Sequence, residues 1–158
     1  MQISSPAFEN YESIPPQYTC DGDGINPPLE FADIPENTKS LALIVDDPDA
    51  PIGLFTHWVV ANIDPQTTMI RERQVPKGAI EGQNSTGTLG FIPPCPPEGL
   101  HHYRFQLFAL SGELDMNSGD TRDEIETAMS PLVIARAELV GIYMREYPEV
   151  GLGSDSDI

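Results

Sequence analysis

The side chains best suited to chemistry in this sequence are its three histidines, His57, His101 and His102. Two of them are adjacent and open the largely apolar segment "LHHYRFQLFAL" (100–110), which directly follows the proline-rich stretch "CPPEG". The third lies near the start of "FTHWVVANID" (55–64). A carboxylate next to an imidazole orients the ring, and the imidazole changes its charge near neutral pH. The histidines are therefore the first candidates for a binding or catalytic site.

Alternating apolar residues predict that these histidines lie on β-strands. Three strands are expected, in "SLALIVDD" (40–47), "THWVVANI" (56–63) and "LHHYRFQLFA" (100–109). One face of each strand is apolar except near a strand end. These faces are expected to carry, in turn, Leu41, Leu43, Val45 and Asp47; His57, Val59, Ala61 and Ile63; and His101, Tyr103, Phe105, Leu107 and Ala109. His102 shares its face with polar residues, so we expect His101 to point inward and His102 to point to water.

If the three strands are neighbours, their polar ends meet at the rim of an apolar core. The residues that would converge there are Asp47, His57, His101 and Tyr103. Two imidazoles and a phenol could donate hydrogen bonds to a phosphate or a carboxylate, with Asp47 orienting the rings. Purely structural histidines and a local acidic turn at Asp49 remain the alternatives at this point.

Other kinds of site have weaker support in the sequence. It contains no HxH, HExxH or CxxC motif, so we expect no dedicated metal site. It contains no GxSxG motif, and Cys95 stands among prolines without a helix N-terminus that would lower its pKa. A Cys95–His101 pair is the one hydrolytic option left open. We therefore expect no enzymatic activity and no cofactor.

The bulk composition limits the possible partners and the compartment. The chain has 158 residues and a formal net charge of −17, which disfavours binding to nucleic acid or to an anionic membrane surface. An anionic ligand therefore requires a local site. No apolar run reaches the roughly 18 residues of a membrane span, and no secretory signal is recognisable, so we expect a cytoplasmic protein. Two cysteines, Cys20 and Cys95, favour free, partly buried thiols, with a single long-range bridge as the alternative.

The remaining segments predict few helices. "GDTRDEIETAMS" (119–130) predicts a helix, with Thr121 as its N-cap and Glu124 completing a capping box. Residues 130–147 predict a helical turn followed by a closing strand. Residues 74–99 predict a long loop region, with short strands inside it as an alternative. We expect a mostly β single domain over residues 1–147 with one or two short helices, and a flexible acidic tail over 148–158.

Four motifs, in this order, resemble the phosphatidylethanolamine-binding protein family, which includes Raf kinase inhibitor protein and short bacterial and archaeal relatives. They are "YTCDGDGINPPLEF" (18–31), "LALIVDDPDAP" (41–51), "THWVVANI" (56–63) and "CPPEGLHHYRFQLFAL" (95–110). The resemblance covers residues 1–147. It implies a large central antiparallel sheet packed on a smaller sheet, with a small anion pocket at one end. By motif position, the pocket residues that it implies are Asp47, Asp49, His57, Pro94, His101 and Tyr103.

The sequence departs from the family in the loop that should form one wall of the pocket, around Pro94 to Pro97. Prokaryotic relatives usually carry a glycine pair there, whereas "GFIPPCPP" (90–97) has Ile92 and Pro93. Glycine lets backbone N–H groups approach an anion closely, and proline has no N–H group. We expect the anion affinity or the shape of this pocket to differ from that of relatives.

The resemblance favours a non-enzymatic binding protein. Its expected ligand is phosphate, a phosphate-like head group such as phosphorylethanolamine, or a carboxylate, free or on a partner protein. A protease or kinase inhibitor that acts through the protein surface is the first alternative, and it implies a protein partner. A small hydrolase that uses the His/Asp cluster is the second. The sequence leaves both a monomer and a homodimer open.

Overall fold

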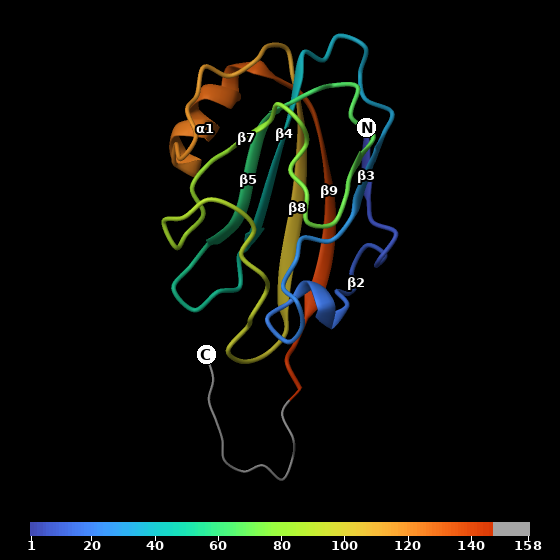
Figure 1. Cartoon of the computed structure of the whole chain (residues 1–158), viewed down its shortest axis with the longest axis vertical. Helices are drawn as coiled ribbons and strands as arrows, with labels where there is room; N and C mark the ends of the chain where they lie inside the picture. The colour runs from blue at the N-terminus through green and yellow to red at the C-terminus, as the bar shows by residue number, and fades with distance from the viewer. Residues whose placement is uncertain (147–158) are drawn as a thin grey trace.

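The computed structural model describes residues 1–146 and confirms a mostly β fold with two sheets (Figure 1). The larger sheet has the strand order β2-β9-β8-β4-β5-β7, and the smaller one the order β1-β3-β6. All neighbouring strands are antiparallel except β2 and β9, which pair in parallel. The strands of the larger sheet are β2 (Glu12–Ser13), β4 (Ser40–Asp47), β5 (Phe55–Ile63), β7 (Ile80–Glu81), β8 (His101–Leu110) and β9 (Val133–Tyr143). Those of the smaller sheet are β1 (Gln2–Ser4), β3 (Leu29–Ala32) and β6 (Met69–Ile70).

Strand β4 lies at the centre of the molecule, and all of its residues are buried. It is covered on both sides because its two faces belong to two apolar clusters. Leu43 and Val45 pack in the core between the two sheets, whereas Ala42 and Ile44 pack toward the helix. The predicted strands at 40–47, 56–63 and 100–109 are thus confirmed as the neighbours β4, β5 and β8.

The predicted helix is confirmed as α1 (Arg122–Met129). The Thr121 side chain accepts a hydrogen bond from the backbone N–H of Glu124, and the Glu124 carboxylate accepts one from the backbone N–H of Thr121, so the capping box is complete. Ile125 and Met129 bury the apolar stripe of the helix against the larger sheet. In Figure 1, α1 lies next to β7 and β5, and the blue N-terminal segment lies at the opposite edge of the view. Two short 3₁₀ turns, η1 (Pro16–Tyr18) and η2 (Ser130–Leu132), complete the helical structure of the described residues.

The two cysteines form a disulfide, so the expectation of free thiols is wrong. Cys20 and Cys95 are 75 residues apart, and the sequence spacing gives no sign of their meeting. The fold brings their two loops together, and the N–H group of Cys20 donates to the carbonyl of Pro94 at 3.0 Å. Closing so long a loop contributes about 4 kcal/mol in a chain-entropy account.

The tail predicted for residues 148–158 lies outside the described residues. Within residues 1–146, no helix has the length and apolar character needed to cross a membrane.

Candidate functional site

A cavity of about 310 Å³ lies where the end of β4 meets the starts of β5 and β8. Antiparallel neighbours bring these three ends to one side of the sheet, as the sequence predicts. Four polar side chains, all buried, form what we call the polar floor: Asp47, His57, His101 and Tyr103. The rest of the lining, apart from the disulfide at Cys95, is the apolar wall: Ala50, Pro51, Ile52, Phe55, Ile92, Pro93, Pro96 and Pro97.

Asp47 and His101 form a buried pair at the bottom of the cavity. The distance from His101 Nδ1 to Asp47 Oδ2 is 2.6 Å, and the other carboxylate oxygen accepts the N–H of Asp49 at 2.7 Å. A carboxylate can only accept, so the proton lies on Nδ1 of His101. The ring is thereby fixed in orientation, and Nε2 remains as its second polar atom.

His57 reaches the cavity through a β-bulge. Val45 pairs with Trp58 and Asp46 with Thr56, so His57 is an extra residue without a partner in β4. The bulge reverses the alternation of β5. The predicted face of His57, Val59, Ala61 and Ile63 is therefore wrong: Val59 and Ala61 pack toward α1. Ile63 packs between the sheets because a second register shift, between Val60 and Ile63, reverses the alternation again.

The wall loop fixes the tautomer of His57. Its Nδ1 lies 2.5 Å from the carbonyl oxygen of Ile92, and the N–H of Ile92 donates back to the His57 carbonyl at 2.9 Å. Since a carbonyl only accepts, Nδ1 carries the proton, and Nε2 of the neutral ring is an acceptor. Burial lowers the pKa of His57 and thereby favours the neutral ring. The hydrogen bond to Ile92 opposes this effect in part.

Tyr103 supplies a hydrogen-bond donor on the polar floor. Its ring lies edge-on to His57 at 5.3 Å and stacks with His101 at 6.3 Å between ring centroids. The hydroxyl has no hydrogen-bond partner among residues 1–146. Burial, together with the charge of Asp47, raises the pKa of Tyr103 far above its ordinary range, so the phenol keeps its proton.

Two of the predicted site residues do not line the cavity. Asp49 lies outside it and holds His102: its Oδ2 accepts the N–H of His102 at 2.8 Å and lies 2.7 Å from Nδ1. These contacts lower the pKa of Asp49. The side chain of His102 is 42% exposed against 6% for His101, as expected from alternation. The carbonyl of Pro94 accepts from the N–H of Cys20, and Pro94 does not line the cavity.

Sequence reasoning missed most of the apolar wall. Ile52 lies in the loop after "DPDAP" and Phe55 is the first residue of β5, and their apolar character was the only available signal. The wall also offers few backbone donors. The N–H of Ile92 is engaged with His57, and the wall prolines have none. Hydrogen bonds to a ligand must therefore come mainly from side chains on the floor.

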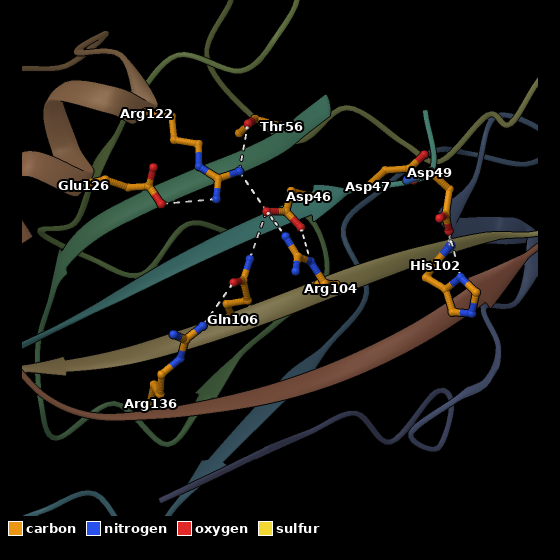
Figure 2. A network of polar contacts seen from close by, with 10 residues as sticks. All are labelled: Asp46, Asp47, Asp49, Thr56, His102, Arg104, Gln106, Arg122, Glu126 and Arg136. Carbon is orange, nitrogen blue, oxygen red and sulfur yellow. Dashed lines mark hydrogen bonds and ion pairs between the residues drawn. The ribbon is translucent and has the colours of Figure 1, made fainter. Parts of the chain in front are cut away.

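A second polar cluster lies on the opposite face of the same strand ends (Figure 2). Asp46 is fully buried and accepts hydrogen bonds from Arg104 Nε at 2.7 Å, Arg122 Nη1 at 2.8 Å and Gln106 Nε2 at 3.0 Å. Figure 2 shows its carboxylate directed at the two arginines, with Asp47 and Asp49 apart from them. We call this group the Asp46 network; its further members are Thr56, Glu126 and Arg136.

Comparison with known proteins identifies relatives along almost the whole chain. Residues 4–144 match the family described as phosphatidylethanolamine-binding protein. A UPF0098 protein of Methanothermobacter thermautotrophicus is 44% identical over 150 residues, which cover 92% of this chain and 99% of that protein. A UPF0098 protein of Aquifex aeolicus is 46% identical, with coverage of 92% and 90%.

Two solved structures share the fold. The crystal structure of CT736 from Chlamydia trachomatis, described as a homologue of phosphatidylethanolamine-binding protein, has a TM-score of 0.89 at 41% identity. It is aligned over 92% of this chain and 97% of its own. Escherichia coli YbcL, described as a member of the mammalian family, has a TM-score of 0.85 at 30% identity, with coverage of 92% and 98%.

Proposed function

Because the chain belongs to the phosphatidylethanolamine-binding protein family, we propose that it is a non-enzymatic binding protein whose cavity accepts one phosphate-like or carboxylate group. The observation that carries this proposal is the buried Asp47–His101 pair next to the partnerless hydroxyl of Tyr103 in one cavity. The acid group of a ligand can supply hydrogen-bond partners to the phenol and to the ring nitrogens of this cavity.

The polar floor offers both donors and acceptors to an acid group. Tyr103 donates to a ligand oxygen. The Nε2 atoms of His57 and His101 accept from a ligand hydroxyl when the rings are neutral, and donate to an anionic oxygen when they are protonated. A phosphate or carboxyl group that carries one proton therefore fits the neutral floor, and a fully ionised group fits after a ring takes up that proton. Asp47 holds the His101 ring in the same orientation in both protonation states.

The disulfide weighs against the hydrolase alternative. Cys95 is bonded to Cys20 and holds no thiolate, so the Cys95–His101 pair loses its nucleophile. The described residues that line the cavity include no serine or lysine. An inhibitor acting through its surface remains a prediction, as does the cytoplasmic location.

Thermal unfolding in the presence of inorganic phosphate or phosphorylethanolamine tests the proposal. Each ligand should raise the midpoint, because binding to the folded state stabilises it. His101→Ala should lose this increase, measured from the variant's own midpoint, and His102→Ala should keep it. An equal response of both variants, or no increase in the wild type with any acid, contradicts the proposal.

A further inference from the structure

A second hollow of the protein surface has a charge opposite to that of the whole chain. It has a volume of about 1000 Å³ and is lined by residues 64–78, from the connection between β5 and β7 that includes β6. We propose that this hollow, which we call the basic hollow, binds an acidic peptide segment of a partner protein. The proposal is independent of the proposed function, because the cavity lies at the start of β5 and shares no lining residue with the basic hollow.

The basic hollow gathers a large share of the cations of the protein. The chain has eight lysine and arginine residues against 25 aspartate and glutamate residues. Three of these eight line the basic hollow, namely Arg71, Arg73 and Lys77. Asp64 is the one carboxylate among its described lining residues, so the cations exceed the carboxylates by two. In a chain with a net charge of −17, such a cluster attracts anionic groups locally while the rest of the surface repels them.

The three cations remain available to a partner. Arg73 contacts Asp23 at 3.5 Å, and because these side chains are 66% and 70% exposed, the pair contributes little. Arg71 and Lys77 are exposed, and neither side chain forms an ion pair within residues 1–146. The arginines of the Asp46 network, by contrast, are held by short contacts to a buried carboxylate.

Buried side chains hold the arginines of the basic hollow in place. Asn26 donates from Nδ2 to the carbonyl of Arg71, and its Oδ1 accepts from the N–H of Arg73, both at 3.0 Å. These bonds stabilise Arg73 at a φ of 61°, a left-handed conformation that is unfavourable for residues other than glycine. Glu72, between the arginines, accepts a hydrogen bond from the hydroxyl of Tyr18 and does not line the hollow. The fold thus keeps the cations at the hollow, and the carboxylate between them away from it, before any partner binds.

The size and the apolar lining of the basic hollow favour a peptide over a small ion. Its volume lies at the upper end of the range found for small-molecule sites, so a single small anion would fill little of it. Met69 and Val75 line it and are 38% and 40% exposed. Because β6 is the outer strand of the smaller sheet, an extended segment can lie along its edge. A segment that alternates carboxylate and apolar side chains would contact both the cations and these two residues, whereas a long polyanion would also meet the acidic surface outside the hollow.

Fluorescence anisotropy of the whole protein with a labelled peptide in which glutamate and leucine alternate tests the proposal. We expect saturable binding at low ionic strength that weakens as salt is added, because salt screens exposed charges. The same peptide with glutamine in place of glutamate should bind about tenfold more weakly, since several exposed ion pairs are lost.

The two lysines of the chain provide matched variants. Lys77→Gln and Lys39→Gln each remove one charge from an exposed side chain, but Lys77 lines the basic hollow and Lys39 does not. Lys77→Gln should weaken binding of the glutamate peptide about threefold, the effect of one exposed ion pair. Lys39→Gln should leave the affinity almost unchanged. His101→Ala should bind the peptide as the wild type does, because His101 lines only the cavity.

Four results would overturn the proposal. Equal weakening by the two lysine variants would mean that the overall charge of the protein controls binding. Equal affinity for the glutamate and glutamine peptides would mean that only apolar contacts bind. Phosphatidylserine vesicles that bind the wild type but not Lys77→Gln, without binding of the peptide, would assign the hollow to a membrane surface. These three results leave the proposed function intact. Loss of peptide binding in His101→Ala would place the peptide in the cavity, which would support the proposed function instead.

Discussion

Asp46 and Asp47 are adjacent in sequence and lie on opposite faces of β4, in two sites of different character. Both carboxylate oxygens of Asp46 accept hydrogen bonds from arginine or glutamine. Arg122 in turn also pairs with Glu126. Asp47 engages one imidazole and one backbone N–H, and its neighbours on the floor keep unused donors and acceptors. The Asp46 carboxylate is fully engaged and joins three elements, although Arg122 Nε is buried without a partner among residues 1–146. The floor residues instead border a cavity, where a ligand can reach their remaining donors and acceptors.

The two faces are also anchored differently. The Asp46 network ties α1 to β4 and β8 through side chains, with Arg122 on the helix and Arg104 on β8. The cavity face relies on a covalent bond: the Cys20–Cys95 disulfide fixes the loop that carries the wall.

Removing the disulfide should cause the largest loss of stability. The double substitution Cys20→Ala and Cys95→Ala releases a loop closure worth about 4 kcal/mol. Urea unfolding measures the loss, and addition of a reductant to the wild type should reproduce it. The double variant itself should not respond to reductant. A loss below about 1 kcal/mol would show that the wall is held by packing alone.

Neutralising Asp46 should cost more than neutralising Asp47. Asp46→Asn leaves two arginines facing a neutral amide, and arginine cannot discharge, so we expect a loss of about 3 kcal/mol. In Asp47→Asn, the new amide faces His101, an imidazole that can be neutral, so we expect a loss of about 1 kcal/mol in the free energy of unfolding. Equilibrium unfolding in urea compares the two isosteric variants. The reverse order would remove the distinction between a structural and a binding face.

The sequence predicts the elements better than the site details. The apolar alternation of β8 and the Thr121 capping box are local signals, and both correctly predict the structure. The placement of His101 inside and His102 outside follows from the same alternation. Local signals suffice there because side-chain direction is set by the strand itself.

Features that depend on register between strands could not be predicted. The bulge at His57 arises from the pairing of β5 with β4, and alternation along β5 alone assigns the wrong face. The Asp46 network joins residues from β4, β8 and α1 that are up to 76 positions apart. The disulfide, and the position of the wall next to the floor, depend likewise on contacts between distant loops.

Lowering the pH should reduce the free energy of unfolding through His57, which is buried on the cavity face. Its pKa is lowered by burial, so below about pH 6.5 the unfolded chain binds a proton that the folded protein does not. His57 therefore makes the protein less stable as pH falls from about 6.5 through the folded-state pKa, by up to about 1.4 kcal/mol per pH unit.

His57→Gln removes this contribution. The free energy of unfolding of the wild type minus that of the variant should decrease as the pH is lowered over this window, in urea titrations at matched ionic strength. A difference that stays constant with pH would mean that His57 titrates as it does in the unfolded chain.

Breaking the exposed Asp49–His102 pair should have the smallest effect. Both side chains are more than one third exposed, so Asp49→Asn should cost about 0.5 kcal/mol. Phosphate should still raise the unfolding midpoint of this variant, because Asp49 does not line the cavity. Loss of that increase would place Asp49 in the binding site after all.

A crystal structure grown in phosphate tests the central claim most directly. We predict an ordered anion within hydrogen-bonding distance of the Tyr103 hydroxyl and of His101 Nε2. The strongest competing site is the basic segment with Arg71, Arg73 and Lys77, which borders a different hollow on the surface. A well-ordered phosphate at that segment, with none on the polar floor, would contradict the account.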